Sequence, residues 1–255
     1  MKKLFYLLFL VALVSCGDDE VIGPSGTVNV NLNAKYDGQD LVLGQAYQVP
    51  GANQIQFDQF SFFISNVVLL EAETEDETDL LEVQLADFSA NTSPANVKPV
   101  SFEFKTVPAV KYRGIKFNVG VPSSLNKSSV YSYGAGHPLK QAFDEYFWSD
   151  GSSFFFMKLA GGYDASANGS FANSFELFPA KNANYASVTL YKDFTLNANG
   201  SIDLNLDVDV LKLLLDDNGQ PIDLNDAANL STYSPENSDL SALLMGNFQD
   251  AVELK

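Results

Sequence analysis

The chain of 255 residues contains one cysteine, one histidine and one tryptophan. A single cysteine excludes an intramolecular disulfide, and one cysteine with one histidine excludes a zinc site built from these side chains alone. Positive charge is also scarce, because 15 Lys and Arg residues stand against 32 Asp and Glu residues, for a net charge of −17. A chain this acidic repels phosphate backbones, so we expect no nucleic-acid partner.

The apolar run near the N-terminus is too short to cross a membrane. It covers only residues 4–14, whereas a spanning helix needs about 20 apolar residues. Lys2 and Lys3 precede it and small residues follow, so residues 1–15 are predicted to be a secretory signal peptide. Leu13-Val14-Ser15-Cys16 resembles a bacterial lipobox, so Cys16 is predicted to carry the lipid and to begin the mature chain.

The residues after Cys16 predict a tether. Residues 16–26 begin with the acidic sequence Gly17-Asp18-Asp19-Glu20, which resembles the signal that directs lipoproteins of Bacteroidetes-type bacteria to the cell surface. We therefore expect an outer-membrane lipoprotein whose membrane partner is reached through the lipid anchor. Both a periplasm-facing and a surface-exposed orientation stay open, and an unidentified envelope protein is a further possible partner.

The remaining sequence alternates between apolar and polar residues, which is typical of half-buried strands. No long linker divides residues 27–255, so this range is predicted to be one domain. We expect an all-β fold, a single β-sandwich of Greek-key type with a short C-terminal helix. Expected core positions are Val28, Val30 and Leu32, the β-prone residues 54–70, Leu81, Val83 and Leu85, Val100, Phe102 and Phe104, and Ile115, Phe117, Val119 and Val121.

Several local patterns make sharper predictions. Residues 188–196 and 202–210 flank Asn199-Gly200, a dipeptide typical of the tight turn in a β-hairpin. The apolar residues 154–159 predict a strand buried on both faces. Residues 138–148 and 239–253 have the spacing of amphipathic helices, and the second is the stronger pattern.

Few residues suggest chemistry. His137, the sole imidazole, is a candidate copper ligand, with a simple surface histidine as the alternative. Trp148 is either a site aromatic or a core residue. The acidic loop from Asp216 through Asp226 leaves open a surface Ca²⁺ site or a plain solvated turn. No nucleophile–base pair or phosphate-binding loop is visible, so we do not expect an enzyme.

Several stretches, taken together, resemble one known family. Residues 59–69, 107–121 with Leu125-Asn126, His137-Pro138-Leu139, residues 146–151 and 154–161, Asp207-Val208-Asp209, and Met245-Gly246-Asn247-Phe248 follow its order and spacing. The family is that of MbnP-like proteins, the methanobactin-associated periplasmic copper-binding family. The resemblance covers roughly residues 30–250.

The resemblance implies an all-β envelope protein that binds copper through histidines, with an oxidised tryptophan associated with the site. It points to His137 as metal ligand and to Trp148 as the aromatic, and Met157, Met245 or carboxylates could contribute. The sequence departs from the pattern at residues 175–179, which contain no histidine, and at Asp150, where a second tryptophan is usual. Two hypotheses follow: a copper-binding domain, or a relative that serves as a surface binding or adhesion module for a protein or a glycan.

Overall fold

The computed structural model describes residues 23–74, 76–127, 129–130, 133–232 and 238–255. The predicted signal peptide and Cys16 lie outside the described residues. Strands predominate and the helices are short. In chain order the elements are β1 (Ser25–Tyr36), β2 (Gln39–Asp40), β3 (Ala46–Gln48), β4 (Gln54–Glu71), β5 (Glu77–Asp87), η1 (Pro94–Asn96), β6 (Val100–Pro108), β7 (Lys111–Val119), α1 (Pro138–Gln141), α2 (Phe143–Tyr146), β8 (Phe147–Trp148), β9 (Ser153–Phe154), β10 (Met157–Tyr163), β11 (Asn173–Leu177), η2 (Asn182–Asn184), β12 (Ala186–Thr195), β13 (Ser201–Asp209), α3 (Val210–Leu213), η3 (Ala227–Asn229), α4 (Ser238–Gly246), α5 (Phe248–Ala251) and β14 (Val252–Leu254).

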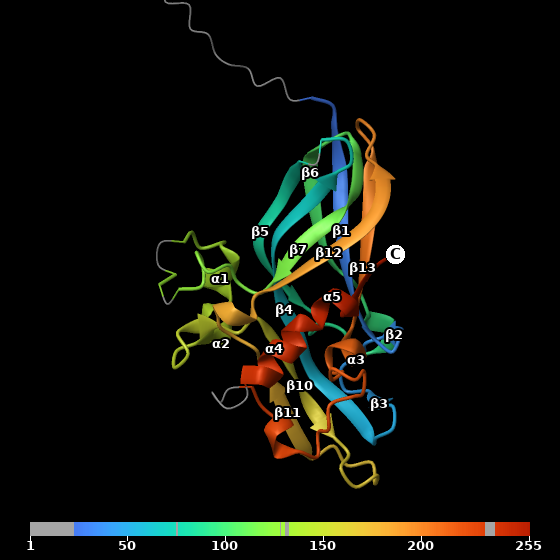
Figure 1. Ribbon diagram of the computed structural model, residues 1–255, viewed down its shortest axis with the longest axis vertical. Coiled ribbons are helices and arrows are strands. Elements are labelled where there is room, and N and C mark those ends of the chain that lie inside the picture. Colours follow the sequence, from blue (N-terminus) through green and yellow to red (C-terminus); the bar gives the residue numbers. More distant parts are fainter. Residues whose placement is uncertain (1–22, 75, 128, 131–132, 233–237) are drawn as a thin grey trace, which may run out of the picture.

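Two sheets form a β-sandwich, as the sequence predicts (Figure 1). The five-stranded sheet has the order β14-β13-β1-β2, with β6 also paired to β1. The seven-stranded sheet has the order β11-β10-β4-β7-β12, with β3 and β5 also paired to β4. Strands β1 and β13 run parallel, and the other pairings in these two sheets are antiparallel.

The alternation predicted for β1 is confirmed. Val28, Val30 and Leu32 are almost completely buried, because successive side chains of a strand point to opposite faces and one face packs on the core. The outward asparagines bond to β13 in register, and Asn33 Nδ2 donates to Asp207 Oδ1 at 3.0 Å. Two further asparagines of β1 bond to β13 in the same way.

Strand β4 is covered on both faces over its central part. Phe60 and Phe62 pack on one side, where the Phe62 and Phe248 ring centroids lie 5.3 Å apart. Phe63 packs on the other side, 5.5 Å from the Tyr146 ring and 5.8 Å from the Phe154 ring. The segment that contains α1, α2, β8 and β9 therefore covers the face of the sheet on which Phe63 lies.

The predicted hairpin at Asn199-Gly200 is wrong. Strand β12 pairs with β7 in the larger sheet, whereas β13 pairs with β1 in the smaller sheet. The turn itself forms, with Asn199 at a φ of 57°. Its backbone bonds to the start of β1, because Asn199 N–H donates to Ser25 O and Thr27 N–H donates to Gly200 O. The turn therefore carries the chain from one sheet to the other.

The predicted helices are shorter than expected. Residues 138–148 form the four-residue helices α1 and α2, and then Trp148 belongs to strand β8. Residues 239–253 fall into α4 and α5, and the chain then returns to the smaller sheet as β14. The predicted strand 154–159 is interrupted between β9 and β10, although Phe154, Phe156 and Leu159 are fully buried. None of the helices in the described part of the chain has the length and apolar character needed to span a bilayer.

Candidate functional site

His137 lies half-buried at the start of α1, where it forms the N-terminal cap. Its Nδ1 accepts a hydrogen bond from the Leu139 N–H at 3.2 Å. Its ring stacks on Tyr133, with centroids 4.0 Å apart and an interplanar angle of 8°. Both contacts hold the imidazole against its own loop.

The hydrogen bond that Nδ1 of His137 accepts bears on metal binding at the other ring nitrogen, Nε2. In a neutral imidazole with an accepting Nδ1, the proton is on Nε2. A metal ion at Nε2 would displace this proton, and a proton on Nδ1 would then oppose the Leu139 N–H. Metal-bound histidines usually have the reverse arrangement, in which the second ring nitrogen donates to an oxygen. In this arrangement Nδ1 of His137 serves as the helix cap, and the role of His137 as a copper ligand stays a prediction.

Trp148 is held between an aromatic ring and a cation. Its ring stacks on Phe155 with centroids 5.9 Å apart and an angle of 12°. The Lys181 Nζ lies 5.3 Å from the indole centroid. Gly151 packs on the indole so closely that a Cβ there would lie 2.0 Å from Cε3. These contacts fix Trp148 as a packed residue at the edge of the core.

A second ammonium group lies beside the same aromatic cluster. Lys158 is 7% exposed, its Nζ lies 4.4 Å from the Tyr146 centroid, and it donates to the Glu145 carbonyl oxygen at 2.8 Å. Burial lowers the pKa of Lys158, and the nearby Glu145 carboxylate acts against this shift. Lys181 therefore places an ammonium group on the Trp148 ring, whereas the Lys158 charge is paired with the Glu145 carboxylate at 3.6 Å.

The residues present do not fit a copper centre of the kind that the resemblance implies. In the described parts of the chain, no three His, Cys, Asp or Glu side chains gather into a group that could hold a metal ion. The possible sulfur ligands, Met157 and Met245, are buried in the core at 0% and 1% exposure. The two residues stack on different rings, His137 on Tyr133 and Trp148 on Phe155.

The acidic loop uses its carboxylates locally. Asp216 Oδ1 accepts from the N–H groups of Asn218 and Gln220, both at 2.8 Å, and these bonds hold the pKa of Asp216 below its usual range. Asp223 Oδ1 accepts from both nitrogens of Asn225 at 2.9 Å. These contacts are those of hydrogen-bonded turns.

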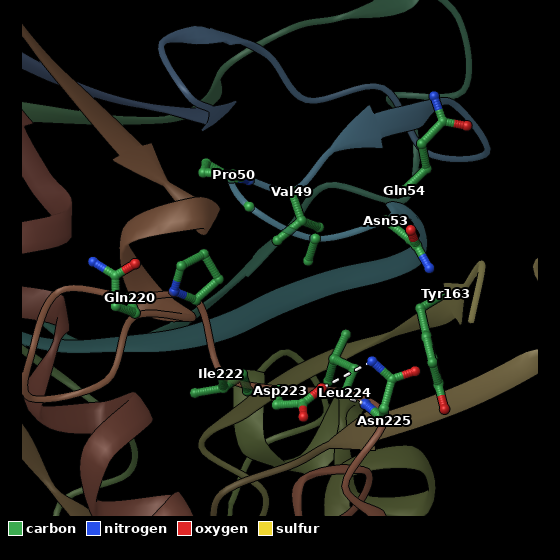
Figure 2. A pocket seen from close by; sticks show the side chains of 13 residues that line it. Val49, Pro50, Asn53, Gln54, Tyr163, Gln220, Ile222, Asp223, Leu224 and Asn225 are labelled. Carbon is green, nitrogen blue, oxygen red and sulfur yellow. Dashed lines mark hydrogen bonds between the residues drawn. The ribbon is translucent and has the colours of Figure 1, made fainter. Parts of the chain in front are cut away.

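A cleft that the sequence did not predict lies next to this loop. Residues 49–54, Tyr163 and residues 220–225 line it, and its volume is about 380 Å³ (Figure 2). We refer to it as the loop cleft. Its lining combines side-chain amides with apolar groups, and Asp223 is its one carboxylate. The volume lies within the range of small-molecule sites, roughly 300–1,000 Å³.

Hydrogen bonds within each wall hold the shape of the loop cleft. Gln48 Nε2 donates to the Ala52 carbonyl oxygen at 2.6 Å, and the Val49 N–H donates to Asn53 O at 3.2 Å. On the other wall of the cleft, Asn229 Nδ2 donates a hydrogen bond to the Asp223 carbonyl oxygen at 2.9 Å. The cleft is thus formed before any ligand arrives, which reduces the entropic cost of binding.

Sequence reasoning missed the loop cleft for a physical reason. Its lining comes from three segments that are more than 50 residues apart in the chain and that only the fold brings together. Residues 49–54 and 220–225 each resemble an ordinary polar turn, and Tyr163 is the last residue of β10. The available signal was the amide-rich sequence Asn53-Gln54 at the start of a long strand, and it is not specific.

The comparisons with known proteins agree on one family. The family model MbnP matches residues 25–235. No curated protein matches the chain. Among solved structures, MbnP from Methylosinus trichosporium matches with a TM-score of 0.57 and 14% identity, over 90% of this chain and 98% of that one. At this identity the structural match shows a shared fold, and the family match over most of the chain makes this protein a member of the MbnP family.

Proposed function

We propose that this MbnP-family chain is a lipid-anchored envelope protein that binds a small ligand in the loop cleft. The observation that carries the proposal is a preformed cleft with unpaired polar groups. The side-chain amides of Asn53 and Gln54 and the Tyr163 hydroxyl form no hydrogen bond with any described residue. Polar groups of this kind provide the specific contacts in ligand sites. The proposal includes no catalytic step.

The position of the cleft in the fold supports this function. The chain enters the domain next to the far end of β4, where Pro24 O accepts the Ala109 N–H at 2.8 Å and Lys111 O accepts the Ala72 N–H at 3.0 Å. The loop cleft contains Gln54, the first residue of β4. An extended strand of 18 residues spans roughly 55 Å at about 3.3 Å per residue.

An anchor at Cys16 would therefore hold the loop cleft away from the membrane. In Figure 1, β1 begins at the upper end of the molecule, and β3, β10 and β11 lie toward the lower end. A ligand in the surrounding medium would reach such a cleft without contacting the lipid surface.

The experiment locates the binding site with a set of small fragments that is not biased toward one ligand class. Backbone amide signals of the soluble domain would be assigned by nuclear magnetic resonance and followed while a mixed set of small organic fragments is added. We expect the largest shifts at residues 49–54, 163 and 220–225. Shifts that gather instead around His137 and Trp148, or that spread without any cluster, would overturn the proposal. An Ala52→Trp variant fills the cleft and should abolish the cluster.

Copper binding at His137 is the second candidate, and membership of the MbnP family favours it. The resemblance links that family to copper, and His137 is half-buried and so within reach of solvent. Against it stand the capping role of Nδ1 and the Lys181 ammonium group on the Trp148 ring. A Cu(I) titration of the wild type and His137 variants separates the two candidates.

A further inference from the structure

A second depression shares part of its wall with the loop cleft. The second one has a volume of about 230 Å³ and is lined by Gln48, residues 52–54, Asp164, Ala167 and Gly169. Ala52, Asn53 and Gln54 line both. We refer to the second one as the side hollow. The two hollows therefore adjoin, with the two free amides at the boundary between them.

The recess formed by the two hollows offers little charge to a ligand. In the loop cleft, Asp223 already accepts two hydrogen bonds from Asn225. In the side hollow, the Asp164 carboxylate accepts the N–H groups of Ser166, Asn168 and Gly169 at 3.2, 3.1 and 2.7 Å. Asp164 is 2% exposed, so its charge is enclosed by its own loop. The groups left for a ligand are neutral amides, a hydroxyl and the Oδ2 atom of the exposed Asp223.

The lining of the recess contains apolar as well as polar groups. Pro50, Pro221 and Ile222 line the loop cleft together with Gln220, and the half-buried Tyr163 is seen on its other side, where Asn53 and Asn225 also lie (Figure 2). Tyr163 combines an apolar ring with a polar hydroxyl. A sugar ring has the matching character, because its C–H faces are apolar and its rim carries hydroxyls that both donate and accept hydrogen bonds. Amides also donate and accept hydrogen bonds, so they suit such hydroxyls.

The net charge of the protein narrows the ligand further. At −17 the chain repels anions, and no lysine or arginine lines either hollow. Acidic sugars and phosphorylated ligands therefore lack a counter-charge here. The two adjoining volumes favour a ligand longer than one sugar unit.

We infer that the recess formed by the loop cleft and the side hollow binds a neutral oligosaccharide, with Tyr163 against a sugar face and the amides of Asn53 and Gln54 on its hydroxyls. This inference rests on the proposed function, because it names the ligand class of the same cleft. In this arrangement the side chains of Asn53 and Gln54, which line both hollows, contact the junction between two sugar units.

The test uses a panel of neutral trisaccharides: maltotriose, cellotriose, laminaritriose, mannotriose and chitotriose. Each is titrated into the soluble domain while amide signals are followed. We expect at least one to bind with a Kd below about 5 mM and to shift residues 49–54 and 163, a modest affinity typical of an open site. The matching monosaccharide should bind about tenfold more weakly, because it can occupy only one hollow.

Variants of recess residues distinguish specific binding from non-specific binding to the protein surface. Tyr163→Ala and Asn53→Ala should each weaken binding at least about fivefold. The matched control is Tyr191→Ala, which removes a tyrosine that is 73% exposed on β12 and lies outside the recess. It should leave the affinity unchanged. Thermal melting of each variant confirms that it is folded.

Two results would overturn the inference: no amide shift with any of the five sugars at about 10 mM, or binding that both recess variants retain in full. The fragment map keeps this failure apart from failure of the proposed function. If fragments gather in the loop cleft but no sugar binds, the cleft is a site for another ligand class. If neither fragments nor sugars bind there, both proposals fall.

Discussion

His137 is a candidate copper ligand in the sequence and a helix cap in the structure. Its ring caps α1 and stacks on Tyr133. We predict that His137→Ala lowers the free energy of unfolding by about 1 kcal/mol, since the Leu139 N–H loses its acceptor. His137→Asn should retain most of the stability, because asparagine is a good capping residue. Urea denaturation of the three proteins checks this, and equal losses in both variants would contradict a capping role.

Tyr146 links burial to alkaline stability. It is 3% exposed, its hydroxyl lies 2.8 Å from Ser61 Oγ, and burial raises its pKa to about 12. Above pH 10 the unfolded chain loses the tyrosine proton while the folded chain retains it, so stability falls as pH rises from 10 to 12. The loss from this group is about 2 kcal/mol at pH 12.

Tyr146→Phe should remove this part of the pH dependence. We expect the unfolding free energy of the variant to decline less steeply between pH 10 and pH 12 than that of the wild type. Tyr191→Phe, at an exposed position, is the control and should follow the wild-type curve. Parallel curves for all three proteins would show that Tyr146 does not titrate differently in the folded state.

At the scale of the element, glycine at the junction of β4 and β10 allows a close backbone approach. The register of this pair shifts between Ala160 and Gly161, and a Cβ on Gly161 would lie 2.0 Å from the Gln56 carbonyl oxygen. We predict that Gly161→Ala lowers stability by about 2 kcal/mol or more, because one of the two strands must move.

Gly246→Ala is the matched control for this prediction. No atom lies within 4 Å of the position its Cβ would take, and the residue ends helix α4. Alanine should be neutral there or stabilise by up to about 1 kcal/mol. Chemical denaturation measures both variants, and a Gly161→Ala protein as stable as the wild type would contradict the close approach.

The elements also show what sequence patterns can and cannot predict. The boundaries of β4 were predicted almost to the residue, because the β-prone run of residues 54–70 is a local feature. The alternation in β13 was equally clear, but its partner was not. Pairing depends on which sheet buries the apolar face, and Asn199-Gly200 fits a hairpin and a crossing between sheets equally well.

At the scale of the whole molecule, the same limit explains the candidate site. His137 and Trp148 were visible as the sole residues of their kinds, yet only the fold reveals the cap and the Lys181 contact. The loop cleft was invisible because its three segments meet only after both sheets are formed. Composition indicated only that nucleic acid is not a partner, through the excess of acidic residues.

The proposed anchor makes a prediction for the cell. Wild-type protein should be found with the membrane fraction, and Cys16→Ala should leave the protein soluble or unprocessed, because the variant has no thiol to carry the lipid. Mass spectrometry of the N-terminal peptide checks the acyl chains, and protease treatment of intact cells distinguishes surface from periplasmic exposure. A Cys16→Ala protein that stays in the membrane fraction would contradict the anchor.

From the capping role of His137 we predict that this chain keeps the MbnP scaffold without using His137 as a copper ligand. The most direct test is a Cu(I) titration of protein purified without chelators, with wild type, His137→Ala and His137→Asn compared side by side. We predict substoichiometric copper after purification and the same weak titration curve for all three proteins. Near-stoichiometric copper in the wild type that is lost in both variants would contradict the account.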